Sequence, residues 1–122
     1  MRHTVSLTEN FEFRRVYGRG KSVGSAHIVL YALPNRRKVS RLGITVSTKV
    51  GKAVVRNQIR RRLKEIYRSQ EVNMLPGFDI VIVARVKASG ASYQSLERDF
   101  LYVGKKLAIL QAAIPTKSER EV

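Results

Sequence analysis

Cysteine is absent from the sequence, and this absence excludes disulfide bonds, thiolate nucleophiles and every zinc site that uses cysteine. Histidine is nearly absent as well: only His3 and His27 occur, in unrelated segments and without a second metal ligand at a suitable spacing. The chain therefore lacks the usual side chains for holding a catalytic metal ion or forming a covalent intermediate. We expect neither catalytic nor metal-binding residues in it.

Acidic residues and long apolar runs are also scarce. The pairs Glu9/Glu12 and Glu97/Asp99 are interpreted as first-turn residues of two helices, where they face the positive end of the helix dipole. No apolar run approaches the roughly 18 to 20 residues that span a membrane, and no signal-type apolar segment follows the first residues. A nuclease with its own carboxylate cluster is disfavoured, and we expect a cytoplasmic protein without membrane association.

Positive charge is what the sequence has in excess. Against 9 Asp and Glu there are 24 Lys and Arg, which give a formal net charge of +15. Such a charge attracts polyanions, although composition alone does not choose between nucleic acid and anionic lipid. The 122 residues, 43% of them hydrophobic, are enough for one core. We predict a single domain over 1–122, with a short N-terminal arm at 1–7 and a flexible tail at 113–122.

Hydrophobic periodicity and turn residues predict the order helix, three short strands, helix, strand, helix. The expected ranges are 8–17, 21–23, 27–33, 41–47, 52–70, 78–84 and a last helix that begins after Ser92. This order is typical of an α/β protein, here a single-domain α-β sandwich with helices packed on one sheet. The helix at 52–70 would cross between two parallel strands, and such crossovers are ordinarily right-handed.

The helix expected at 52–70 has one apolar side and one cationic side. Its apolar residues recur at helical spacing, whereas the stretch 52–68 carries seven basic residues and a single acid, Glu65. Like charges four residues apart should cost the isolated helix about 1 kcal/mol in all. A solvated surface is the plain explanation, but the near absence of acids favours contact with phosphates.

The turn before this helix is a less specific feature. It contains Lys49, Gly51 and Lys52 and joins a strand to the helix, whose first amides can receive a phosphate. An ordinary strand-to-helix turn explains the spacing equally well.

A group of aromatic residues is also less specific. Phe13 and Tyr17 lie four residues apart, and Tyr31 lies on a strand. By spacing alone such aromatics belong to a core, whereas stacked on unpaired bases they would contribute about 1 to 3 kcal/mol per base. Phe11 is left as core or surface.

An ordered set of motifs resembles the bacterial ribonuclease P protein family. The basic helix motif of that family, Arg-Asn-Arg/Lys-x-Lys/Arg-Arg, stands at 56–61 as RNQIRR, after the strand LGITVS at 42–47 and the turn KVGKAV at 49–54. Further matches follow in the family's order at 20–23, 29–31 and 78–82. The resemblance thus spans most of the chain. Two positions depart from the family: Gln58 replaces a basic residue, and Arg62 stands where an apolar residue is frequent, so that it either binds RNA or extends over the edge of the core.

The resemblance implies a fold, a function and two sites. The crossover would be left-handed, as in a ribosomal-protein-like fold. This RNA-binding domain would contact a catalytic RNA subunit and the 5′ leader of precursor tRNA, while that RNA cleaves the leader with bound Mg²⁺. No obligate protein partner is expected. The implied contacts to the RNA subunit are Lys49, Lys52, Arg56, Asn57, Arg60, Arg61, Lys64 and Arg68. The implied contacts to the leader are Phe13, Tyr17, Tyr31 and Ser47.

Two other classes of protein explain the charge and size. A ribosomal or RNA-chaperone protein without enzymatic activity would have the same composition. A DNA-binding helix module would need a recognition helix that reads bases, and the helix at 52–70 offers Asn57 and Gln58 among many like charges.

Overall fold

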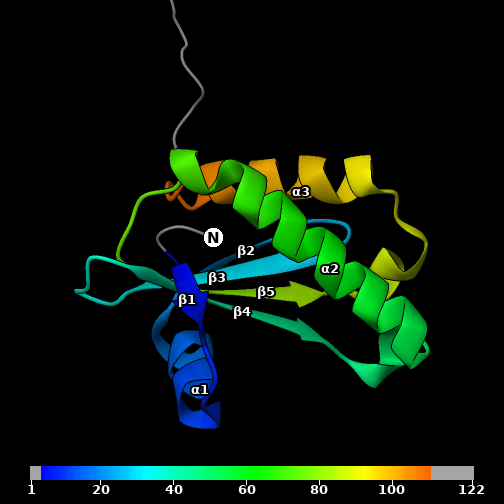
Figure 1. Cartoon of the computed structure of the whole chain (residues 1–122), viewed down its shortest axis with the longest axis horizontal. Helices are drawn as coiled ribbons and strands as arrows, with labels where there is room; N and C mark the ends of the chain where they lie inside the picture. Colours follow the sequence, from blue (N-terminus) through cyan, green and yellow to red (C-terminus); the bar gives the residue numbers. More distant parts are fainter. Residues whose placement is uncertain (1–3, 111–122) are drawn as a thin grey trace, which may run out of the picture.

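The computed structural model describes residues 4–110, which form one sheet and three helices (Figure 1). The elements in chain order are β1 (Thr4–Ser6), α1 (Asn10–Arg19), β2 (Lys21–Gly24), β3 (Ile28–Pro34), β4 (Ser40–Val46), α2 (Ala53–Gln70), β5 (Phe78–Ala84) and α3 (Tyr93–Lys106). Short 3-10 turns occupy Thr48–Val50, Glu71–Asn73 and Val86–Gly90. The α/β class is confirmed, and the predicted element types are correct within a few residues of each boundary.

The strand β1 was not predicted, because residues 4–6 were assigned to an N-terminal arm. It pairs in parallel with the start of β4, with Thr4 opposite Ser40 and Ser6 opposite Leu42. The buried hydroxyl of Thr4 also lies 3.0 Å from that of Tyr67 in α2. Three residues are too few to display the alternation that marks a strand in sequence, so only the pairing partner reveals β1.

The sheet has the strand order β1-β4-β5-β3-β2. β4 and β5 are parallel neighbours, whereas β3 is antiparallel to both β5 and β2. With α2 in front of the sheet in Figure 1, β4 and β5 point the same way and β5 lies on the side that makes the crossover left-handed. This is the uncommon hand, which the family resemblance implied and general statistics did not.

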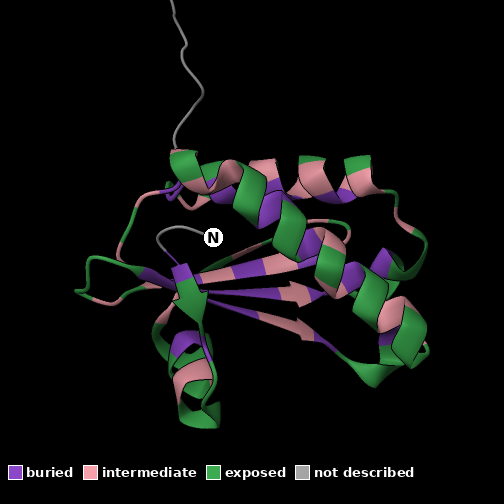
Figure 2. Cartoon of the chain, viewed as in Figure 1, coloured by how far each residue is buried: buried purple, intermediate pink, exposed green. Residues whose placement is uncertain are grey.

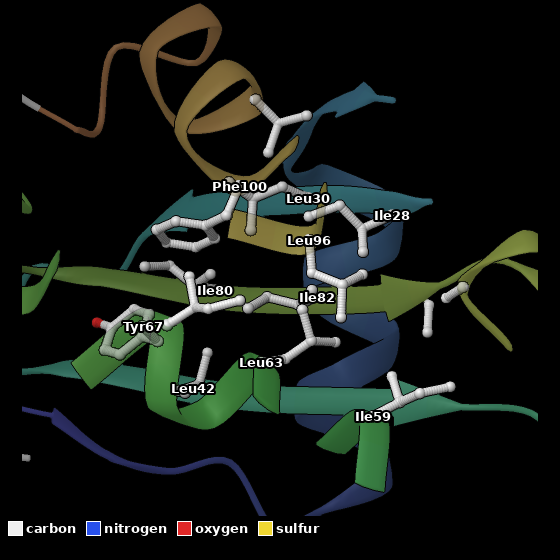
Figure 3. Close-up of a cluster of buried hydrophobic side chains, with 14 of the residues drawn as sticks. Ile28, Leu30, Leu42, Ile59, Leu63, Tyr67, Ile80, Ile82, Leu96 and Phe100 are labelled. Carbon is white, nitrogen blue, oxygen red and sulfur yellow. The ribbon is translucent and has the colours of Figure 1, made fainter. Parts of the chain in front are cut away.

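Helices cover both faces of the sheet. Side chains alternate between the faces of each strand, and the main core lies under α2 and α3, where Leu30 and Ile82 of the sheet meet Leu63 and Phe100 of the helices (Figure 3). A smaller cluster of Leu7, Val16 and Val81 lies under α1 on the other face. α1 is short and crosses the sheet, so part of that face stays open beside it.

The ends of two helices are set by local features. α1 begins at Asn10 and not at residue 8 as predicted, because Glu9 is its N-cap and forms a reciprocal capping box with Glu12. α3 ends at Lys106, and just beyond it Ala108 adopts a positive φ of 60°. Leu110 is nevertheless buried, in a bridge to Met74. The tail expected at 113–122 lies outside the described residues.

Candidate nucleic-acid interface

The outer side of α2 is the cationic surface that the sequence predicts. The helix turns its buried residues toward the sheet and its exposed residues away from it (Figure 2). Arg61, Lys64 and Arg68 are exposed, and among residues 4–110 neither Arg61 nor Lys64 forms an ion pair. Arg68 lies 3.4 Å from Glu65 at the surface, a pairing that adds little stability in water. The surface is therefore open to an anionic partner.

The remaining predicted residues of α2 support this surface from its amino end. Arg60, half-buried, donates to the side chain of Asn57 at 2.9 Å, which aligns the two on one flank. Arg56 donates from Nε to the carbonyl of Gly51 at 3.1 Å and so closes the turn before the helix. Asn57 is exposed. Arg56 therefore has a structural role, while its contact with RNA stays a prediction.

The turn before α2 brings two more lysines to the same end. The side chain of Ser47 accepts a hydrogen bond from the amide of Lys49 at 3.0 Å, and Val50 is buried beneath the turn. Lys49 and Lys52 are both exposed. The N-cap of α2, Lys52, makes no side-chain cap, and the first turn contains no acid, so the first amides keep their affinity for an anion.

An aromatic groove lies beside α1 on the opposite face of the sheet. The rings of Tyr17 and Tyr31 meet edge to face with centroids 5.0 Å apart, and the Tyr17 hydroxyl lies 3.1 Å from Oγ1 of Thr45. Phe13 rests on the backbone of Gly43. Phe13, Tyr17 and Thr45, with Asn10 and Arg14, line a hollow of about 350 Å³. The predicted aromatics thus lie together, half in the smaller core and half on an open groove.

Ser47 is separated from this group. It lies just after the end of β4 and faces a different hollow, which it shares with Arg85 and Lys87 beyond the end of β5. Sequence analysis did not single out Arg85 or Lys87, because neither belongs to a motif. Phe11, for which two readings were open, is 56% exposed and lies on the surface.

A larger hollow joins the groove to the cationic side of α2. β1 pairs with β4 only as far as Leu42, which leaves the edge of β4 uncovered at Gly43 and Ile44. The hollow at this edge, about 450 Å³, reaches from Phe13 on one face to Arg60, Arg61 and Lys64 on the other. No spacing in the sequence predicts this connection, since its two sides lie far apart along the chain.

Comparison with known proteins identifies the family. Residues 1–108 match the family Ribonuclease P. The chain belongs to the ribonuclease P protein family. A protein of Natranaerobius thermophilus named "Ribonuclease P protein component" is 39% identical over 111 residues, which make up 91% of this chain and 96% of that protein.

Solved structures of this family have the same fold. The RNase P protein of Staphylococcus aureus superposes with a TM-score of 0.81 at 30% identity, covering 87% of this chain and 97% of that one. The RNase P protein of Thermotoga maritima gives a TM-score of 0.73 at 32% identity, covering 80% of this chain and 92% of that one. These likenesses favour the ribonuclease P family over the ribosomal and DNA-binding alternatives.

The two positions that depart from the family motif have different surroundings. Gln58 is exposed on α2. Arg62 is half-buried and donates from Nη1 to the carbonyl of Ala91 at 3.1 Å. Arg62 thereby ties α2 to the segment that precedes α3, at the edge of the core.

A buried ion-pair network fixes α1 to the sheet, and sequence analysis missed it. Asp79, which lies within the apolar run of β5, is fully buried and accepts from Nε and Nη2 of Arg41 at 2.8 and 2.7 Å. Arg41 also pairs with Glu12 of α1. Asp79 has two further partners: Arg15 lies 3.5 Å from it, and the side chain of Asn35 donates a hydrogen bond to it at 2.9 Å. Burial raises the pKa of Asp79, but the bonds from Arg41 and Asn35 outweigh it and hold the pKa below its ordinary value.

The prediction that Glu97 and Asp99 lie in the first turn of the last helix is wrong, because α3 begins at Tyr93 and its first turn contains no acid. Asp99 instead binds the β2–β3 hairpin. Its Oδ2 accepts from the backbone amide of His27 at 2.9 Å and from the hydroxyl of Ser25 at 2.8 Å, and Nδ1 of His27 lies at 2.8 Å. Burial raises the pKa of Asp99, but these hydrogen bonds bring the pKa below its ordinary value. All three groups meet one carboxylate oxygen, so the cluster ties the β2–β3 hairpin to α3.

Among residues 4–110 no three His, Asp or Glu side chains are grouped closely enough to share a metal ion. Within the same range, no helix is both long and apolar enough to cross a membrane.

Proposed function

We propose that this chain is the protein subunit of a cytoplasmic ribonuclease P, which binds the catalytic RNA subunit and the 5′ leader of precursor tRNA. Its role is to assist the endonucleolytic removal of that leader, which produces the mature 5′ end of tRNA. Membership of the ribonuclease P family supports the partnership with the RNA subunit. The family resemblance implies which residues contact each RNA, and the geometry of the two surfaces supports that assignment.

The observation that carries the proposal is the hollow that joins the two surfaces. Arg61 and Lys64 on one side suit the phosphates of a structured RNA, and Phe13 on the other side suits an unpaired base. A single strand that leaves a bound RNA can therefore continue along the edge of β4 into the aromatic groove. An RNA subunit on α2 and a leader beside α1 would meet at this hollow.

The family resemblance implies separate roles for the RNA and the protein. The chemistry of cleavage belongs to the RNA subunit, with Mg²⁺ held mainly by the RNA. The protein contributes binding: Lys49, Lys52 and the arginines of α2 lower the repulsion between two polyanions, which reduces the concentration of Mg²⁺ that the complex needs. Tyr17 and Tyr31, already in contact with each other, offer a firm stacking surface with little ordering cost.

Reconstitution tests the proposal. A bacterial ribonuclease P RNA transcript is incubated with precursor tRNA at low Mg²⁺, with and without the protein. We expect the protein to increase the rate of leader removal, and the variant Arg61→Gln/Lys64→Gln to increase it less at the same protein concentration. An RNA that cleaves equally well with and without the wild-type protein at every Mg²⁺ concentration would exclude the proposed role.

A further inference from the structure

A second cationic surface lies on the other flank of α1, away from the aromatic groove. We call it the arginine corner, and it consists of Arg15 and Arg19 of α1 with Arg36 and Arg37 of the turn between β3 and β4. The four line one hollow of about 390 Å³. Arg15 follows Phe13 by two residues, about 200° around the helix, so the corner and the groove occupy opposite flanks of α1.

The charge of the arginine corner is largely uncompensated. Asp79 and Arg41 also line this hollow and pair with each other, and Arg41 pairs with Glu12 as well. Of the four arginines of the corner, only Arg15 contacts Asp79, at 3.5 Å. Arg19, Arg36 and Arg37 are exposed, and within residues 4–110 they form no ion pair. Three guanidinium groups therefore face solvent around one hollow.

The turn that carries Arg36 and Arg37 is held in one conformation. Asn35 donates its backbone amide to the carbonyl of Gly77 at 2.8 Å, and its side-chain oxygen accepts from the amide of Arg37, also at 2.8 Å. The side chain of Asn35 donates in turn to the buried Asp79 at 2.9 Å. Arg36 adopts a φ of 59°, where glycine or asparagine is more usual. The same buried carboxylate thus anchors both α1 and the turn.

We propose that the arginine corner binds the sugar–phosphate backbone of RNA at a site separate from the outer side of α2 and from the aromatic groove. Guanidinium groups pair with phosphate oxygens through two parallel hydrogen bonds, and this turn presents them without prior rearrangement. α2 covers the opposite face of the sheet, and the turn lies at the end of the sheet away from the start of α2 (Figure 1). The RNA at the corner must therefore approach from another side.

The two candidate sources of these phosphates, the RNA subunit and precursor tRNA, rest on the function proposed above. The following experiment distinguishes them. The variant Arg36→Asn/Arg37→Gln removes two charges. Asparagine is chosen for position 36 because it tolerates the positive φ found there. The matched control, Arg98→Gln/Lys105→Gln, removes two exposed charges from α3. Affinities for a labelled ribonuclease P RNA transcript, and for labelled precursor tRNA added to the assembled complex, are measured across a series of KCl concentrations.

For one of the two RNAs, we expect the slope of log affinity against log salt to become shallower by nearly one unit for each lost phosphate contact, about 1.4 to 1.8 in all. The control should change it by much less. A shallower slope with the transcript assigns the corner to the RNA subunit. A shallower slope only with precursor tRNA, in the assembled complex, assigns it to precursor tRNA. Arg19→Gln, on α1, repeats the test without altering the turn.

The outcomes also separate this inference from the proposed function. If the wild-type protein binds both RNAs and stimulates cleavage, but Arg36→Asn/Arg37→Gln and Arg19→Gln behave like the control, the arginine corner is not a binding site. If the wild-type protein itself neither binds the transcript nor stimulates cleavage, the proposed function fails first.

Discussion

The ring of Phe13 lies so close to Gly43 that a Cβ built at residue 43 would be 2.4 Å from a ring carbon. The contact joins α1 to β4 at the point where the aromatic groove meets the larger hollow. Glycine at this position is required by the close approach of a ring and not by the backbone torsion. One residue without a side chain therefore sets the depth of the proposed leader site.

Gly43→Ala should displace the Phe13 ring and destabilise the protein by about 1 to 3 kcal/mol, as overpacking does in a well-packed interior. Urea unfolding followed by circular dichroism measures the change. Gly18→Ala is the control, since nothing lies within 4 Å of a Cβ built there, and alanine should be neutral or slightly stabilising in the helix. Equal stability of the two variants would show that Phe13 does not rest on Gly43.

Arg41→Ala should destabilise the protein by about 3 kcal/mol, because it leaves the carboxylate of Asp79 buried without its main partner. The loss stays near the lower end of the usual range because Arg15 and Asn35 still contact Asp79. Thermal and urea unfolding provide the measurement. Glu65→Ala, which removes the exposed ion pair with Arg68, should change the stability by less than about 1 kcal/mol.

Stability should fall in acid because Asp79 and Asp99 have pKa values below the ordinary 3.8. A carboxyl group whose folded pKa is depressed contributes its full stability above the unfolded pKa and loses it as the pH falls through the folded value. Free energies of unfolding should therefore be level near neutral pH and decline below about pH 4. In the variant Asp99→Asn the free energy of unfolding should fall less as the pH is lowered. A fall equal to that of the wild-type protein would mean that Asp99 does not contribute to the acid sensitivity.

Arg61→Gln/Lys64→Gln should weaken binding to a ribonuclease P RNA transcript, since both residues are exposed without an ion pair in the described part of the chain. The slope of log affinity against log salt should become shallower by about 1.4 to 1.8 for two lost phosphate contacts. Fluorescence titration at several KCl concentrations measures it. A slope equal to that of Arg98→Gln/Lys105→Gln would place the RNA elsewhere.

Tyr17→Ala should reduce the preference for precursor tRNA with a leader over tRNA without one, by about 5- to 150-fold if one stacked base is lost. Tyr17→Phe keeps the ring and removes only the hydroxyl near Thr45, so it should retain most of that preference. Affinities of the assembled complex for the two substrates give the comparison. An equal loss on both substrates would indicate a purely structural role for Tyr17.

Several features followed from the sequence because their signals are local. The helical repeat of apolar residues at 52–70 predicted α2 and its cationic side, since a helix face depends only on spacing along the chain. The apolar run at 78–84 predicted β5, although its buried Asp79 passed unnoticed. The absence of cysteine excluded whole classes of site. The hand of the crossover came from resemblance, because both hands are compatible with the same pattern.

Only the tertiary structure decided which residues from distant parts of the chain are in contact. The pairing of Arg41 with Asp79, and the hollow that brings Phe13 to Arg61, depend on strand register and on how far β1 extends along β4. Such contacts join residues far apart in the chain, and no local pattern records them. The sequence by itself determined a basic, cysteine-free α/β protein with one cationic helix, while the packing of α1 and α2 around the open edge of β4 decided that its two candidate RNA surfaces meet.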